Sequence, residues 1–95
     1  MTKKTVDFNK TGIGELPDNK PVVYELLTQG GKNNYTGVAQ RGRVQARLQD
    51  HLPGGKDPVP GAKVQVQQCP SIDQAKKLEK TIISREQPPH NKQGK

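Results

Sequence analysis

The chain has 95 residues, which is enough for one small domain and too few for two. Sixteen Lys and Arg residues against nine Asp and Glu residues give a formal net charge of +7, which suits a polyanionic partner such as nucleic acid. A single cysteine excludes an internal disulfide. The polar start is unlike a signal peptide, and no apolar run approaches the ~20 residues of a membrane span. We therefore expect a cytoplasmic protein with no membrane partner.

The first part of the chain is polar. It contains Gly12, Gly14 and Pro17, and this composition predicts that residues 1–20 are loosely attached or disordered. The folded domain is therefore expected to span residues 21–95.

A hairpin is predicted at the start of this domain. Apart from Glu25, residues 22–27 are β-branched or apolar and are bounded by Pro21, which favours a strand with Tyr24 on one face and Val23 on the other. The glycine-containing turn at residues 29–32 leads to a returning strand at residues 34–39. A glycine inside a strand often marks the close approach of another backbone or a ligand, and Gly37 occupies such a position.

The rest of the chain alternates helix and strand. Apolar spacing predicts a helix over residues 43–52, a Pro- and Gly-rich loop separates it from a strand over residues 62–67, and Ser71 is a suitable N-cap for a final helix. The Pro pair in residues 87–89 ends that helix. The order β-β-α-β-α predicts an α+β domain whose three-stranded, mainly antiparallel sheet is flanked by helices.

Glu79 lies within the apolar stripe of the final helix, about 20° from Ile72 at 3.6 residues per turn. A carboxylate that faces the sheet is costly unless it is paired. Two interpretations stay open: a side chain that reaches solvent or a lysine, or a ligand of a hard divalent cation. The stripe consists of Ile72, Ala75, Leu78, Ile82 and Ile83.

Three further positions have both a structural and a functional interpretation. Arg47, with His51 one helical turn later, is either part of a solvated basic face or a group that grips a phosphate bidentately. Tyr24 and Tyr35 lie inside the two hairpin strands, where they form either a packed aromatic pair or a pair of hydroxyls directed into a site.

Taken together, these positions resemble the GIY-YIG nuclease domain. The first signature triad corresponds to Val22-Val23-Tyr24 and the second to Tyr35-Thr36-Gly37, with Val22-Val23 in place of Gly-Ile and Thr36 in place of Ile. Arg47 with His51 resembles the arginine motif of the family's first helix, and Glu79 resembles its metal-binding glutamate. Asn91 resembles the asparagine of its closing segment.

The resemblance implies the hydrolysis of DNA phosphodiester bonds with one divalent ion, Mg²⁺ or Mn²⁺. Glu79 would hold the ion, Arg47 would bind the scissile phosphate, and one of the two tyrosines would deprotonate or orient the attacking water. His51 and Asn91 would support the site through hydrogen bonds. Which tyrosine acts on the water is left open.

Two other functions remain under the same fold. One is a non-catalytic nucleic-acid-binding module, and the other is the nuclease toxin domain of an interbacterial delivery system, which would have an immunity protein as a partner. Whether the substrate is duplex, branched or single-stranded DNA, or RNA, is also open. In each case we expect backbone contacts from exposed cations, namely Arg41, Arg43, Lys76, Lys77 and Lys80.

Overall fold

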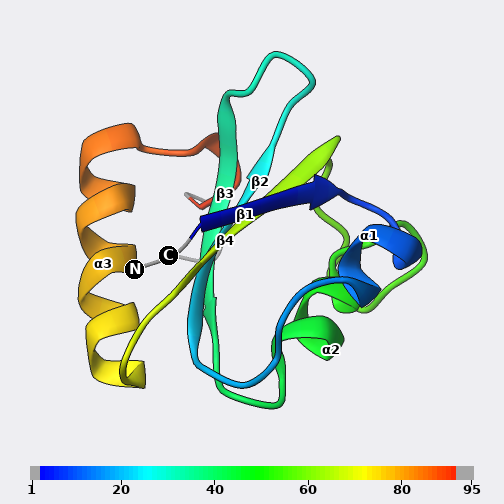
Figure 1. Cartoon of the computed structure of the whole chain (residues 1–95). Helices are drawn as coiled ribbons and strands as arrows, with labels where there is room; N and C mark the ends of the chain where they lie inside the picture. Colours follow the sequence, from blue (N-terminus) through cyan, green and yellow to red (C-terminus); the bar gives the residue numbers. More distant parts are fainter. Residues whose placement is uncertain (1–2, 92–95) are drawn as a thin grey trace.

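The structure is a computed structural model that describes residues 3–91, apart from the side chain of Asn91. In this part of the chain the strands are β1 (Lys3–Asp7), β2 (Val22–Leu27), β3 (Asn33–Ala39) and β4 (Lys63–Gln68). The helices are α1 (Lys10–Gly14), α2 (Val44–Asp50), α3 (Ile72–Glu86) and the 3₁₀ helix η1 (Pro89–Asn91). Figure 1 shows α1 and α2 on one face of the sheet and α3 on the other.

The strands form one antiparallel sheet in the order β1-β4-β2-β3. An α+β fold with an antiparallel sheet flanked by helices is therefore confirmed. The central strand β2 pairs with both β3 and β4, so that Tyr24 lies opposite Gly37 on one side and Val66 on the other. Because β3 is an edge strand, side chains from both faces of the sheet can meet beside it.

The expectation that residues 1–20 are loosely attached or disordered is wrong for β1 and for the segment that follows it. The sheet has four strands rather than three, because β1 pairs with β4 along its whole length. Ile13 and Leu16, which follow β1, are buried in the core. Val6 is the only apolar residue of β1, so the local pattern of this edge strand is weak and its pairing depends on β4, more than fifty residues later.

Two apolar clusters lie on opposite faces of the sheet, as period-two geometry in β2 predicts. The cluster under α1 and α2 contains Phe8, Ile13, Leu16, Val22, Tyr24, Leu26, Ala39, Val44, Leu48, Leu52, Val59, Val64 and Val66. The cluster under α3 contains Val23, Cys69, Ala75 and Ile82, with Val38, Ile72 and Leu78 packed against it. In the described part of the chain, no helix has the length and apolar character needed to cross a bilayer.

The start of α2 is held by the segment that precedes β2. The backbone oxygen of Asp18 accepts a hydrogen bond from the amide of Gly42 at 2.8 Å, and its carboxylate accepts one from the amide of Val44, also at 2.8 Å. An acidic oxygen at a helix start satisfies an amide that has no partner within the helix. Asp18 thus determines where α2, the helix that carries Arg47, begins.

The end of α3 is tied to the start of β3 by Asn33. Its side-chain amide donates to Thr36 Oγ1 at 2.7 Å and to Glu86 Oε1 at 3.0 Å, and its oxygen accepts from the amide of Tyr35 at 3.2 Å. Asn33 is buried, so these bonds lie largely out of water, where a lost partner is costly. The network sets the position of α3 relative to the strand that carries Tyr35.

Glu25, a half-buried residue of β2, makes the stability of the fold depend on pH. Burial raises the pKa of its carboxyl above the ordinary value, and the charge of Glu86 adds to this, while Lys3 and Arg85 oppose it. A raised pKa in the folded state stabilises the fold below the unfolded pKa of about 4.3, and this contribution is lost as the pH rises through the folded pKa. Glu25→Gln is therefore expected to raise the free energy of unfolding at pH 7, with the difference from wild type disappearing below pH 4.

Urea unfolding at both pH values measures this difference. Glu15→Gln is the matched control, because Glu15 is exposed. An equal gain in the two variants at pH 7 would show that net charge, rather than burial of Glu25, determines the effect.

Candidate active site

Tyr24 and Gly37 lie side by side on β2 and β3, and they fit together because Gly37 has no side chain. Tyr24 is fully buried. A Cβ atom at Gly37 would lie 2.5 Å from the Tyr24 hydroxyl oxygen and 2.6 Å from Cζ. The close approach at Gly37 is thus made by the side chain of Tyr24, and the glycine allows this ring to cross β3 toward the edge of the sheet.

His51 follows α2 and holds the Tyr24 hydroxyl from the other side. It is 1% exposed, and its Nε2 lies 2.9 Å from Tyr24 Oη, while its Nδ1 lies 2.8 Å from the backbone oxygen of Asp57. A carbonyl oxygen can only accept, so Nδ1 carries the proton. In the neutral imidazole, Nε2 then accepts the hydrogen bond that the Tyr24 hydroxyl donates.

Tyr35 completes a cluster of three rings. Its ring centroid lies 6.3 Å from that of Tyr24 and 5.1 Å from that of His51, which it meets edge-on. Unlike Tyr24, Tyr35 is partly exposed. Of the two tyrosines, only Tyr35 can present its side chain to solvent or to a substrate.

Both tyrosines resist ionisation. Burial raises the pKa of Tyr24 far above its ordinary value, and a negative charge on Tyr35 would raise this pKa further. The charge of Arg47 and a hydrogen bond with Arg47 lower the pKa of Tyr24. Burial also raises the pKa of Tyr35, against the charge of Arg47 and a hydrogen bond with Tyr24. At neutral pH both side chains are therefore neutral hydroxyls.

Arg47 and Glu79 approach the tyrosine pair from opposite faces of the sheet. Arg47 is an exposed residue of α2, and Glu79 is a half-buried residue of α3. The charge of Arg47 lowers the pKa of both tyrosines and that of Glu79 raises both, which places the two charges close to the hydroxyls. Both charges act at this point because β3 is the edge strand between the helices that carry them.

The structure therefore brings five of the six predicted catalytic residues together, from β2, β3, α2 with its following loop, and α3. Asn91, the sixth, belongs to η1, whose backbone packs against β3. Its side chain lies outside the described residues.

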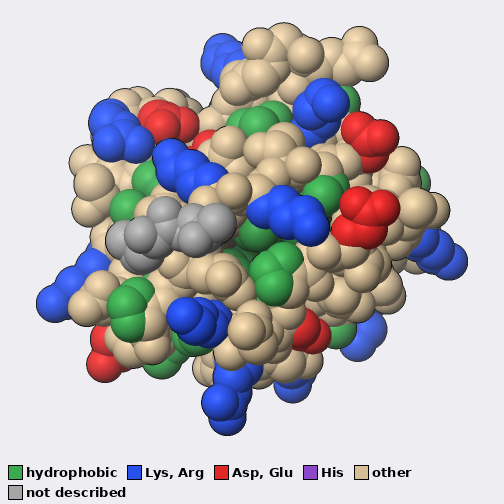
Figure 2. Space-filling view, in the orientation of Figure 1, with side chains coloured by type: hydrophobic (Ala, Val, Ile, Leu, Met, Phe, Trp, Pro, Cys, Tyr) green, Lys and Arg blue, Asp and Glu red, His purple; other side chains and the backbone are tan. Residues whose placement is uncertain are grey.

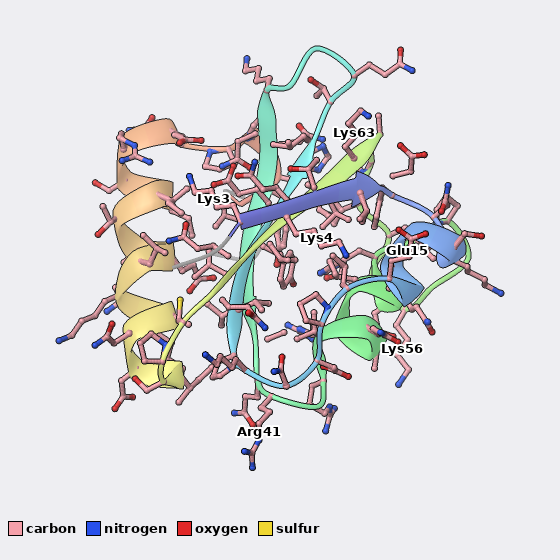
Figure 3. All side chains as sticks on the ribbon, viewed as in Figure 1. Lys3, Lys4, Glu15, Arg41, Lys56 and Lys63 are labelled. Atoms are coloured by element: carbon pink, nitrogen blue, oxygen red, sulfur yellow. The ribbon has the colours of Figure 1, made fainter. Side chains whose placement is uncertain are left out.

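The five cations expected to contact nucleic acid are all exposed but do not form one group. Arg43 and Lys76 line a hollow at the edge of β3, together with Arg47. Arg41 extends away from the body of the protein at the loop after β3 (Figure 3). Lys77 and Lys80 lie on α3 and do not line this hollow.

The opposite edge of the sheet is also rich in lysine but has a different charge pattern. Figure 2 shows the face of the molecule on which β1 lies, where Lys and Arg side chains are spread with acidic groups between them. Lys4 Nζ donates to the backbone oxygen of Glu15 at 3.1 Å, and Lys63 Nζ lies 3.6 Å from a carboxylate oxygen of Asp7 (Figure 3). Lys4 and Lys63 on this side are thus engaged in local contacts.

The carboxylate of Glu79 is the candidate metal ligand near the tyrosines. Within residues 3–91, no three or more His, Cys, Asp or Glu side chains are grouped as metal ligands. Glu79 would thus act as a single carboxylate ligand. This fits Mg²⁺ or Mn²⁺, because Mg²⁺ commonly keeps several waters and binds through one or two carboxylates and the phosphate oxygens of the substrate.

Comparisons with known proteins do not add to this picture, since the sequence matches no protein-family model and no curated protein. The geometry also includes two groups that the sequence analysis did not identify. The backbone oxygen of Asp57 orients His51, and a backbone group carries no signal in the sequence. Gln40 lines the hollow beside Arg43, where an exposed glutamine after a strand has no distinguishing pattern.

Proposed function

We propose that this protein is a divalent-metal-dependent endonuclease that hydrolyses DNA phosphodiester bonds, as its resemblance to GIY-YIG nucleases implies. The observation that carries the proposal is the convergence of Tyr24, Tyr35, Arg47, His51 and Glu79 at the edge of β3. Cytoplasmic action is part of the proposal, and the buried free thiol of Cys69 suits a reducing compartment.

Tyr35 is the group that meets the attacking water in this proposal. It is the partly exposed member of the pair, and Arg47 beside it lowers its pKa while Tyr24 stays buried. A raised pKa leaves Tyr35 mostly protonated at neutral pH, so that it cannot act efficiently as a preformed phenolate. Its oxygen must therefore pass on its own proton when it accepts one from water.

Tyr24 and His51 provide the path for that proton. Tyr24 is hydrogen bonded to His51, and its hydroxyl also acts on the pKa of Tyr35. As the water oxygen attacks phosphorus, its proton moves to Tyr35, the Tyr35 proton moves to Tyr24, and the Tyr24 proton moves to His51 Nε2. The P–O bond to the leaving oxygen breaks in the same displacement, and this oxygen takes the bonding electron pair and a proton from solvent water. His51 ends as an imidazolium and returns its proton to solvent as the hydrogen-bond chain resets.

Arg47 and Glu79 complete the arrangement. The exposed guanidinium of Arg47 can bind the scissile phosphate through two parallel N–H bonds and stabilise its developing negative charge. Glu79 would hold the divalent ion. The chemistry that such an ion supplies when bound is Lewis-acid polarisation of the phosphate oxygens.

The direct test is the cleavage of supercoiled plasmid with Mg²⁺, with Mn²⁺ and with EDTA. Nicking that needs the metal supports the proposal, and the absence of nicking with either metal contradicts it. Branched duplexes, single-stranded DNA and RNA at the same ionic strength then identify the preferred substrate, since salt alone changes the affinity for every polyanion.

The tyrosines are expected to respond differently to loss of the hydroxyl. Tyr35→Phe should lower kcat about 100-fold or more, the usual size of a proton-transfer contribution, with little change in stability because Tyr35 is partly exposed. Tyr24→Phe should also destabilise the fold by about 1–3 kcal/mol, because His51 Nε2 loses its buried donor.

Single-turnover cleavage and urea unfolding of both variants measure these effects. The reverse ranking, with Tyr24→Phe the more damaging to kcat at full folding, would assign the contact with water to Tyr24.

A non-catalytic nucleic-acid-binding module is the second candidate. The basic hollow at the edge of β3 favours it, because cations of this kind bind a nucleic-acid backbone without cleaving it. Metal binding separates the two functions. Stabilisation of the folded protein by Mn²⁺ that is lost in Glu79→Ala supports the nuclease, whereas binding of DNA with no metal effect supports the module.

A further inference from the structure

A hollow of about 290 Å³ opens at the edge of β3. Residues from β3 and the loop after it, from α2 and from the first two turns of α3 surround it. They are Val38, Ala39, Gln40, Arg43, Arg47, Ile72 and Lys76.

The lining has the chemistry of an anion site with an apolar floor. Among the described residues that line the hollow, Arg43, Arg47 and Lys76 are cationic and none is acidic. Val38 and Ile72 are partly buried beneath them. A sugar–phosphate unit combines these properties, because its phosphate is charged and its ribose carbons are apolar.

The size of the hollow limits what can bind. About 290 Å³ is at the lower end of the volumes of ligand pockets, so the hollow admits a small group rather than a large cofactor. One nucleotide backbone unit meets this limit. Its polar lining residues, Gln40, Arg43, Arg47 and Lys76, are all exposed, so a strand can reach them from solvent.

The hollow shares Arg47 with the candidate active site. Arg47 lines it and also acts electrostatically on both tyrosines. Val38 and Ala39 directly follow Gly37, over which the Tyr24 ring lies. A strand whose scissile phosphate is bound by Arg47 would thus place its neighbouring phosphate between Arg43 and Lys76.

We propose that this hollow is a subsite for the sugar–phosphate unit next to the scissile bond, with Arg43 and Lys76 as the ligands of its phosphate. This inference rests on the proposed nuclease function and extends it from the bond that is cut to the strand that carries it. The proposal also divides the exposed cations: Arg43 and Lys76 contact the DNA strand at the hollow, whereas Arg41, Lys77 and Lys80 lie outside the hollow.

The binding test needs no catalysis. A fluorescein-labelled single-stranded DNA oligonucleotide is titrated in EDTA at several salt concentrations with wild type and with Arg43→Gln/Lys76→Gln. The double variant should bind about tenfold more weakly and lower the slope of log Kd against log salt by about one, because one phosphate contact is lost. Thermal unfolding confirms that each variant is folded.

Arg41→Gln/Lys77→Gln is the matched control. Like the test variant, it removes the charge of one Arg and one Lys, but from exposed positions outside the hollow. A clearly smaller loss of affinity in this variant supports the subsite. Equal losses in both double variants would show that net charge alone determines binding and would overturn it, as would the absence of binding by wild type.

A second test locates the phosphate. A single neutral methylphosphonate in the DNA strand should suppress wild-type cleavage at one adjacent bond, and this suppression should disappear in Arg43→Gln/Lys76→Gln. Persistence of the suppression in the variant overturns the subsite while the nuclease function stands. If wild type cleaves nothing but the binding test ranks the two double variants as expected, the nuclease proposal fails and the hollow remains a nucleic-acid site.

Discussion

Glu79→Gln is expected to lower metal-dependent cleavage by at least about 1,000-fold while the protein stays folded. The substitution keeps the shape of the side chain and removes the charge that a hard cation needs. Glu79 is the carboxylate whose charge acts on both tyrosines, whereas the charge of Asp57 raises the pKa of Tyr35. Cleavage of a labelled duplex at saturating Mn²⁺ measures the loss.

Glu15→Gln is the matched control for this variant. Glu15 is an exposed carboxylate at the end of α1, on the side of the molecule seen in Figure 3, and its removal changes the net charge equally. The unfolding midpoint should rise with Mn²⁺ in wild type and in this control, because a ligand that binds only the folded state stabilises it. Full cleavage by Glu79→Gln would contradict the assigned role of Glu79.

Gly37→Ala is expected to have the second large effect, on both stability and activity. The added Cβ would lie 2.5 Å from the Tyr24 hydroxyl oxygen, so the ring must move or the two strands must separate. Overpacking of this kind costs about 1–3 kcal/mol. Movement of the ring also breaks the 2.9 Å bond to His51, and since misplacement by about 1 Å can cost 100-fold in rate, cleavage should fall by at least that factor.

Gly14→Ala provides the comparison. A Cβ at Gly14 would meet no atom within 4 Å. Gly14→Ala should therefore leave the free energy of unfolding and the cleavage rate near their wild-type values. Urea unfolding and plasmid cleavage of the two variants measure the difference. Wild-type activity of Gly37→Ala would show that the position of the Tyr24 ring does not matter for function.

Much of the fold can be predicted from the sequence where the pattern is local and strong. The alternation in β2 correctly assigns Val23 to the face opposite Tyr24, and Ser71 correctly marks the start of α3. The N-terminal strand could not be predicted in this way. Its residues carry little apolar signal, and an edge strand becomes a strand only through the partner with which it pairs.

The candidate site divides in the same manner. The sequence by itself determined which residue types are unusual for their position: a carboxylate in an apolar stripe at Glu79, and a glycine inside a strand at Gly37. Residue types that are unusual for their position can be recognised from the local sequence, because helical and strand periodicity assign each side chain to one face of its element. Spacing also linked Arg47 to His51, which follows it by four residues.

Only the tertiary structure decided how these groups are used. It buried Tyr24 and left Tyr35 partly exposed, although both lie in the middle of similar strands. It bonded His51 to Tyr24 and to the backbone oxygen of Asp57, and it placed Arg43 and Lys76 around one hollow while Arg41 extends away. Exposure and hydrogen-bond partners depend on elements far apart in the chain, and local periodicity carries no information about them.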